Sequence, residues 1–297
     1  IIMNDKIDWK FPSAIVNCEW LAENINDNKV RTYDCTTYLH YRDNDPSLPY
    51  VVESGREQYE KNHIPNSGYI DLQSDLSDKD SPYRFTMPDL KVLSENFKKV
   101  GIGEDYHIVL YSRNGTQWSA RIWWMLRSVG VDNVSILDGG FNEWVRLGLP
   151  TSDKILTFPK SDFNFKPRNE IFIDKEPVIK ALEDKNTKIL NSLTEDIHKG
   201  QNPRYGRPGR IPNSLNIPFH KLLDPETGKF LGAEELLEIF QKNKISYENE
   251  IINYCGGGIA ASLEAFVLYQ LGYKNLKIYD NSLSEWAIDE NLPMEKD

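Results

Sequence analysis

The sequence predicts an α/β protein made of two tandem copies of one unit, each a mainly parallel sheet flanked by helices. Two observations predict this fold class. Residues 108–150 match residues 251–293 when the chain is laid against itself, with Trp144 on Trp286. Short β-rich runs also alternate with helical stretches inside each copy, and this alternation is typical of parallel sheets covered on both faces.

The expected elements follow one another in the same order in both copies. Runs rich in Val, Ile, Leu and Tyr predict strands; they lie at 29–34, 106–111, 134–138, 187–191, 250–254 and 276–280. Apolar residues at three- and four-residue spacing predict helices between them, one of which covers 262–272 and ends at Gly272, a common C-cap residue. We expect domains at 1–150 and 171–297, joined by a linker at 151–170 that contains Pro and Lys.

Composition excludes several classes of partner. The net charge of −10 argues against nucleic acid and acidic membrane surfaces. No apolar run approaches the roughly 20 residues of a membrane span, and the start of the chain lacks a signal-peptide pattern. The three cysteines, Cys18, Cys35 and Cys255, are scattered and show no paired spacing for zinc. We therefore expect no metal and a reducing, cytoplasmic setting.

Cys255 stands directly before three consecutive glycines, between an expected strand and an expected helix. Such a loop lies at the carboxyl end of a parallel strand, where α/β proteins bind ligands. Its backbone N–H groups form an anion cradle, and the same field favours a thiolate. Cys255 is thus the predicted nucleophile, with the cradle formed by Gly256, Gly257, Gly258, Ile259 and Ala260. The alternative is a buried core cysteine beside a tight turn; core filling explains Cys18 and Cys35.

Several motifs together resemble tandem rhodanese domains. They are "DCTTYL", "HIPNSGYIDL", "DLSDKDSPYRFTMP", "DGGFNEW", "NPRYGRPGRIPNSLNIPF", "CGGGIA" and "YDNSLSEW". The resemblance is to the thiosulfate and 3-mercaptopyruvate sulfurtransferases. It implies that Cys255 takes a sulfane sulfur as a persulfide from a small anionic donor and passes it to a thiol or cyanide. It also implies that no cofactor is needed and that the first domain is inactive, with Ser112 in place of the cysteine. We expect a monomer.

The chain departs from the family pattern around the loop. The loop has neither the cations of thiosulfate-preferring members nor the serine of mercaptopyruvate-preferring members. Asn191 and Leu193 stand where members usually carry aspartate and arginine. Arg204 occupies the family position that binds the donor carboxylate, so we include it in the site. Arg207 or Arg210 could supply the missing cation; the alternative is that these arginines pair with surface carboxylates.

Two other functions are weighed against the enzyme. A phosphatase loop of related type needs arginine at position 261, where this chain has alanine. A non-catalytic sulfur carrier or binding protein would explain the losses at 191 and 193, but the intact cysteine argues against it. His63 matches a family position near the loop, and a structural role is expected for it. Because a bare glycine loop offers few contacts, we expect the first domain to contribute side chains to the site.

Overall fold

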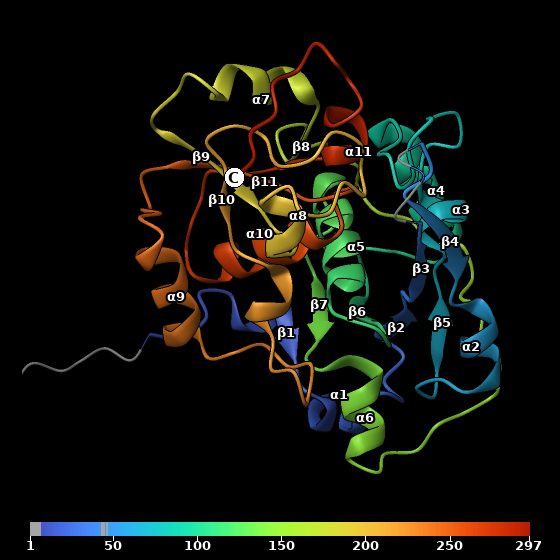
Figure 1. Ribbon diagram of the computed structural model, residues 1–297. Coiled ribbons are helices and arrows are strands. Elements are labelled where there is room, and N and C mark those ends of the chain that lie inside the picture. The colour runs from blue at the N-terminus through green and yellow to red at the C-terminus, as the bar shows by residue number, and fades with distance from the viewer. Residues whose placement is uncertain (1–6, 43–44, 46) are drawn as a thin grey trace, which may run out of the picture.

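The computed structural model describes residues 7–42, 45 and 47–297, which contain two five-stranded sheets (Figure 1). The first has the order β1-β7-β6-β2-β5, with β1 (Ile15–Val16), β2 (Val30–Asp34), β5 (Ser67–Tyr69), β6 (His107–Tyr111) and β7 (Val134–Leu137). The second has the order β10-β9-β11-β12-β8, with β8 (Phe172–Ile173), β9 (Thr187–Asn191), β10 (Leu215–Asn216), β11 (Glu250–Tyr254) and β12 (Leu276–Tyr279). All strand pairs in both sheets are parallel, which confirms the predicted fold class.

Helices flank both sheets (Figure 1). The first domain holds α1 (Cys18–Asn24), α2 (Arg56–Lys61), α3 (Leu72–Leu76), α4 (Leu90–Lys99), α5 (Gln117–Ser128), α6 (Gly140–Arg146) and the 3-10 turn η1 (Pro12–Ala14). The second holds α7 (Lys175–Ala181), α8 (Glu195–His198), α9 (Ala233–Lys242), α10 (Ala260–Gln270), α11 (Ser282–Trp286) and the 3-10 turn η2 (Phe219–Leu222). The helix expected from residue 262 therefore begins earlier, at Ala260, directly after the glycine loop.

The duplicated "IPNS" motif makes the same turn in both domains. Asn66 and Asn213 both adopt positive φ, 58° and 63°. The serine that follows each asparagine hydrogen-bonds the hydroxyl of the tyrosine that ends the central strand, Tyr111 at 3.0 Å and Tyr254 at 2.8 Å. Each turn is thereby tied to the strand that leads into the corresponding loop.

Helices α5 and α10 lie side by side at the centre of the molecule (Figure 1). Helix α10 is buried along almost its whole length, as expected for a helix that is apolar on all faces. The indole N–H of Trp124 donates to the Ser262 carbonyl at 3.0 Å, and the rings of Trp123 and Phe266 meet edge to face at 4.9 Å. This contact fixes the first domain directly against the helix that follows Cys255.

The expected linker segment runs along the first domain. The backbones of His63 and Ser152 exchange two hydrogen bonds, and the Lys166 N–H donates to the Val129 carbonyl at 3.0 Å. At the other end of the chain, Phe11 stacks on Tyr269 of α10 at 4.1 Å. The linker is therefore bound to the first domain, and the N-terminal segment contacts the second.

A two-stranded antiparallel hairpin of the first domain was not expected from the sequence. It consists of β3 (Thr37–Tyr41) and β4 (Tyr50–Ser54) and lies outside both parallel sheets. Tyr41 and Tyr50 face each other in its register. Within residues 7–42, 45 and 47–297, the structure holds no helix with the length and apolar character needed to cross a membrane.

Candidate active site

The loop after β11 is shaped by hydrogen bonds to its carbonyl groups. The carbonyl of Cys255 accepts from the Leu283 N–H at 3.0 Å. The carbonyl of Gly256 accepts from the N–H of Ser284 at 3.0 Å and from its hydroxyl at 2.6 Å. The Gly258 carbonyl accepts from the Ser262 hydroxyl at 2.7 Å. These bonds hold the loop carbonyls against α10 and α11.

The Cys255 sulfur lies inside this curl. Its Sγ accepts a hydrogen bond from the Gly258 N–H at 3.1 Å, and the residue is only 2% exposed. Within the described part of the chain, no acceptor takes the N–H groups of Gly256, Gly257 or Ile259. Those donors, with the start of α10, provide positive partial charge around one sulfur atom. The loop is therefore built to hold a negative charge on or beside Sγ.

Each of the three glycines is required by a close approach. A Cβ on Gly256 would lie 2.1 Å from the Tyr205 hydroxyl, and one on Gly257 would lie 2.7 Å from the Tyr50 hydroxyl. Gly258 has a φ of +82°, and a Cβ there would lie 2.7 Å from the Asp280 carbonyl. A side chain at any of these positions would force its neighbours to move.

The loop opens into a cavity of about 220 Å³ between the two domains. Residues of the first domain that line it are Leu39, Tyr41, Tyr50, Phe85, Asn114, Gln117 and Trp118. Those of the second are Leu193, Tyr205, Phe219, Cys255, Gly256, Gly257, Ile259 and Ala260. Both domains thus form the cavity, as the sequence led us to expect, and four of the five predicted cradle residues line it; Gly258 lies behind them.

Aromatic side chains form much of the cavity wall and contact one another. Tyr50 stacks near Phe85 at 6.1 Å between centroids and meets Tyr205 edge to face at 6.5 Å. Phe85 meets Trp118 edge to face at 5.5 Å. Burial raises the pKa of the phenols of Tyr50 and Tyr205 well above the usual value, so both stay protonated and neutral.

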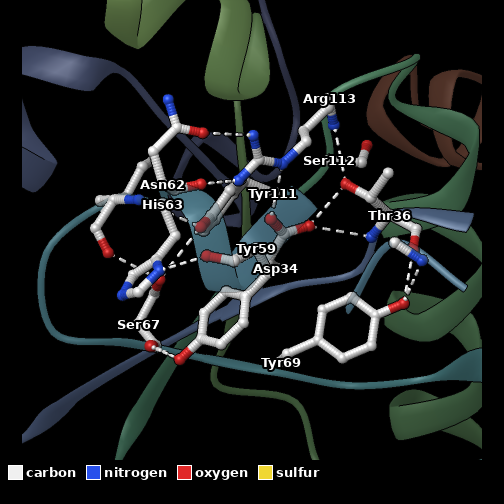
Figure 2. Close-up of polar contacts among 12 residues, drawn as sticks. Asp34, Thr36, Tyr59, Asn62, His63, Ser67, Tyr69, Tyr111, Ser112 and Arg113 are labelled. Atoms are coloured by element: carbon white, nitrogen blue, oxygen red, sulfur yellow. Dashed lines mark hydrogen bonds and ion pairs between the residues drawn. The ribbon is translucent and has the colours of Figure 1, made fainter. Parts of the chain in front are cut away.

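The equivalent loop of the first domain has a different set of polar contacts (Figure 2). Ser112, in the place of the cysteine, donates its hydroxyl hydrogen bond to the Gly115 carbonyl at 2.5 Å. Arg113 folds back, so that its Nε lies 3.1 Å from the buried Asp34 carboxylate and its Nη2 contacts the Asn62 carbonyl. The first-domain loop thus has an arginine, held by Asp34 and Asn62, at the position that follows Ser112, where the second-domain loop has Gly256 after Cys255.

The predicted arginines are placed differently from one another. The guanidinium of Arg204 lies over the Tyr41 ring at 3.8 Å from its centroid, at the edge of the cavity. The guanidinium of Arg207 donates to four backbone carbonyls, those of Trp286, Ala287, Asp289 and Leu292. Arg210 pairs with Glu295 and Asp297, both at 2.8 Å. Arg207 and Arg210 therefore hold the C-terminal segment, and neither lines the cavity.

His63 and the other two cysteines lie within the core of the protein. The His63 ring contacts the Tyr59 carbonyl at 2.6 Å and the Lys154 carbonyl at 3.0 Å, in agreement with the expected structural role. Cys18 and Cys35 are buried, and burial raises the pKa of the Cys18 thiol to about 12 and that of Cys35 well above its usual value. Among the described residues, no cluster of His, Cys, Asp or Glu could hold a metal ion.

The strand end that departs from the family pattern carries no charge toward the cavity. The Asn191 carboxamide oxygen accepts from the Leu193 N–H at 3.0 Å, and its nitrogen lies 3.0 Å from Nδ1 of His198. Burial lowers the pKa of His198 to about 4, so the ring is neutral at physiological pH. Leu193 is 8% exposed and presents an aliphatic side chain at the cavity wall.

The sequence analysis missed the aromatic residues of the site. Tyr41 and Tyr50 come from the β3–β4 hairpin, and Tyr205 directly follows the predicted Arg204. One available signal was the pair of runs "TYLHY" and "YVVES", which flank a segment rich in Asp, Pro and Ser in the pattern of a hairpin. Arg121 was also missed; it reaches from α5 to the Gly258 carbonyl at 3.5 Å.

The rhodanese-like domain model matches residues 17–147 and 174–289. The chain belongs to the rhodanese family. Among rhodanese relatives, it is 31% identical to the human 3-mercaptopyruvate sulfurtransferase, covering 92% of this chain and 91% of that protein. It is 29% identical to thiosulfate sulfurtransferase from Rattus norvegicus, with the same two coverages. The structure of SseA from Escherichia coli superposes with a TM-score of 0.76 at 28% identity, covering 91% of this chain and 98% of that one.

These findings confirm the family that the motifs resembled and agree with the enzyme class it implied. The two rhodanese matches each contain one of the two loops, that of Ser112 and that of Cys255. The relatives include sulfurtransferases named for two different donors.

Proposed function

We propose that this rhodanese is a sulfurtransferase that carries a sulfane sulfur as a persulfide on Cys255. The observation that supports this most directly is that the Gly258 N–H donates to Cys255 Sγ at 3.1 Å, in a loop where the N–H groups of Gly256, Gly257 and Ile259 have no acceptor among the described residues. After transfer, the persulfide carries its charge on the outer sulfur. That charge lies where unpaired N–H donors stabilise it, as an oxyanion hole stabilises oxygen.

Each half-reaction is a displacement at sulfur. The Cys255 thiolate attacks the sulfane sulfur of thiosulfate or the thiol sulfur of 3-mercaptopyruvate, the S–S or C–S bond that joins this sulfur to the donor breaks, and its electron pair leaves with the remainder of the donor. With thiosulfate the leaving group is sulfite, and with 3-mercaptopyruvate it is pyruvate after protonation at carbon. A thiolate or cyanide then attacks the outer sulfur, and the Cys255 thiolate leaves. No further oxidant or reductant enters either step.

Arg204 keeps a proposed role in binding an anionic group of the donor at the edge of the cavity. Its guanidinium lies against Tyr41, and Tyr41 lines the cavity. The cradle residues Gly256, Gly257, Gly258, Ile259 and Ala260 are proposed to bind the transferred sulfur through their backbone. The proposal also includes two domains, at 1–150 and 171–297, joined by a linker at 151–170. It further includes a monomeric state and a cytoplasmic location.

The test is intact mass of the protein after separate incubation with thiosulfate, 3-mercaptopyruvate and inorganic polysulfide. We expect a gain of one sulfur atom that cyanide removes and that is absent in Cys255→Ser. Steady turnover of donor and cyanide separates an enzyme from a sulfur carrier that loads once. Absence of any gain from all three donors would refute the persulfide.

A further inference from the structure

The cavity beside Cys255 has a chemical character that narrows the substrate class. Resting on the proposed sulfur transfer, we propose that the organic thiol which exchanges sulfur with Cys255 carries an uncharged aromatic or apolar group. That group occupies the cavity between the domains while its sulfur meets the persulfide.

The lining of the cavity is neutral. Of the described residues that form it, none carries a charge, and the polar side chains other than tyrosine and the cysteine itself are the carboxamides of Asn114 and Gln117. Most of the remainder are aromatic or aliphatic: Leu39, Tyr41, Tyr50, Phe85, Trp118, Leu193, Tyr205, Phe219 and Ile259. A charged group that entered this space would lose water without gaining an ionic partner, which is unfavourable.

The described cations near the loop do not line the cavity. Arg121 is fully buried behind Gly258 and pairs with Asp280 at 2.6 Å. Arg113 of the first-domain loop pairs with Asp34 at 3.1 Å. Arg204 lies over Tyr41 and is absent from the residues that line the cavity. Among the described residues, the positive partial charge beside the cavity therefore comes from the loop N–H groups next to the Cys255 sulfur, one of which, that of Gly258, donates to Sγ.

The aromatic wall is suited to a flat or bulky apolar group. Tyr50, Phe85, Trp118 and Tyr205 are each no more than 5% exposed and are held by ring-to-ring contacts. Rings fixed in this way need little ordering when a ligand stacks on them. An apolar cavity of about 150 Å³ accepts benzene, so the 220 Å³ here accommodates a benzyl-sized group.

The exchange balances in both directions. As acceptor, the thiolate R–S⁻ attacks the outer sulfur of the Cys255 persulfide, the Cys255 S–S bond breaks, and R–S–SH and the Cys255 thiolate result. As donor, R–S–SH is attacked at its outer sulfur by the Cys255 thiolate, and R–S⁻ leaves. The outer sulfur keeps its proton, or its negative charge when it is deprotonated, in each direction, so no co-reactant is required.

The test uses the full chain loaded at Cys255 with inorganic polysulfide and verified by intact mass. Loss of the sulfur is then timed with phenylmethanethiol, with anionic 3-mercaptopropionate and with cationic 2-aminoethanethiol. Each rate is divided by the rate of the same thiol with a small persulfide in free solution, which removes differences in intrinsic reactivity. We expect the normalised rate for phenylmethanethiol to exceed both others by about tenfold or more.

A matched pair of variants at Leu193 tests whether the uncharged cavity wall causes the preference for phenylmethanethiol. Leu193→Arg places a cation at the cavity wall, and Leu193→Gln is uncharged and polar. We expect only the arginine variant to shift the preference toward 3-mercaptopropionate, by about tenfold relative to the wild type.

The outcomes separate this inference from the function on which it rests. Loading of Cys255 followed by equal or faster normalised discharge with the charged thiols would overturn the apolar-substrate inference and leave the sulfurtransferase intact. Failure of Cys255 to load from any donor would overturn both. Selectivity for phenylmethanethiol in the wild type supports the inference even where a Leu193 variant does not fold.

Discussion

Arg121 of the first domain and Asp280 of the second form an ion pair at 2.6 Å directly behind the glycine loop. The other oxygen of Asp280 accepts from the Met87 N–H at 2.7 Å. The contact is reciprocated, because Asp138, which matches Asp280 in the sequence repeat, accepts from the Phe230 N–H of the second domain at 2.9 Å. Each domain thus uses the equivalent aspartate of the sequence repeat to contact the other domain. The contact made by Asp280 also lies next to the loop that follows Cys255.

Removing the guanidinium tests this coupling. Arg121→Met leaves Asp280 without its buried partner, so we expect a loss of about 3–5 kcal/mol in the free energy of unfolding. We also expect slower sulfur loading, since the Gly258 carbonyl loses a contact. The control is Arg127→Met on the same helix, where the partner Asp132 is on the surface and the expected loss is about 0–1 kcal/mol. Denaturant unfolding measures both; equal losses would contradict the role assigned to Arg121.

A second prediction concerns Gly257 and Tyr50. A Cβ at position 257 would lie 2.7 Å from the Tyr50 hydroxyl, and the next nearest atom is 3.7 Å away, on Phe85. We therefore expect Gly257→Ala to reduce the rate of persulfide formation by about tenfold or more, because the loop must shift. The double variant Gly257→Ala with Tyr50→Phe should recover most of the loss, since the clashing oxygen is gone.

The matched control for this pair is Gly232→Ala, because a Cβ at Gly232 meets nothing within 4 Å. It should leave the loading rate unchanged. If the double variant were as slow as Gly257→Ala alone, the Tyr50 hydroxyl would not be the obstacle, and the glycine would be needed for another reason.

The pH dependence of stability is expected to follow Glu264 on α10. Its carboxyl group is fully buried and bonded to the Ser192 hydroxyl, and burial raises its pKa to about 8 from an ordinary 4.5. In the unfolded chain the group ionises near pH 4.5, whereas in the folded protein it keeps its proton until about pH 8. Its contribution to stability is therefore complete below pH 4.5 and is lost as the pH rises from there through 8.

The variant Glu264→Gln isolates this contribution, since the amide does not titrate. We expect the stability of the variant relative to the wild type to increase between pH 4.5 and 8 by about 1.4 kcal/mol per pH unit at most. Denaturant midpoints measured across this range provide the test. A difference that does not change with pH would show that Glu264 is not protonated in the folded protein.

Much of the fold was predictable because the duplication is visible in the sequence. The expected strands at 187–191 and 250–254 coincide with β9 and β11, and the position of Cys255 after β11 follows from them. The cavity was less predictable. Its walls include Tyr50, Trp118 and Tyr205, which lie far apart along the chain and come together only through the packing of one domain on the other. Neither periodicity nor local motifs encode that packing.

The arginines likewise show that the sequence did not predict which groups a side chain contacts in the folded protein. The segment 198–210 was read as a source of cations for the substrate, yet Arg207 and Arg210 bind carbonyls and carboxylates of the C-terminal segment. Residue type alone could not separate these uses, because a guanidinium binds both kinds of acceptor. The neighbouring Tyr205 lines the cavity instead, and its position depends on the absence of a side chain at Gly256.

The loop of the first domain, which has Ser112 in place of a cysteine, supplies the last prediction. If the cysteine alone made a loop reactive, Ser112→Cys would create a second persulfide site. The structure indicates otherwise, because this loop lacks the three glycines, its Arg113 is held by Asp34 and Asn62 (Figure 2), and the Ser112 side chain is directed to the Gly115 carbonyl. We therefore expect Ser112→Cys in a Cys255→Ser background to gain no sulfur from polysulfide, while the wild type gains one atom. Intact mass after a short incubation and removal of free polysulfide decides the matter. A gain of sulfur at position 112 would mean that the thiol, and not the open glycine loop, is the determining feature of this site.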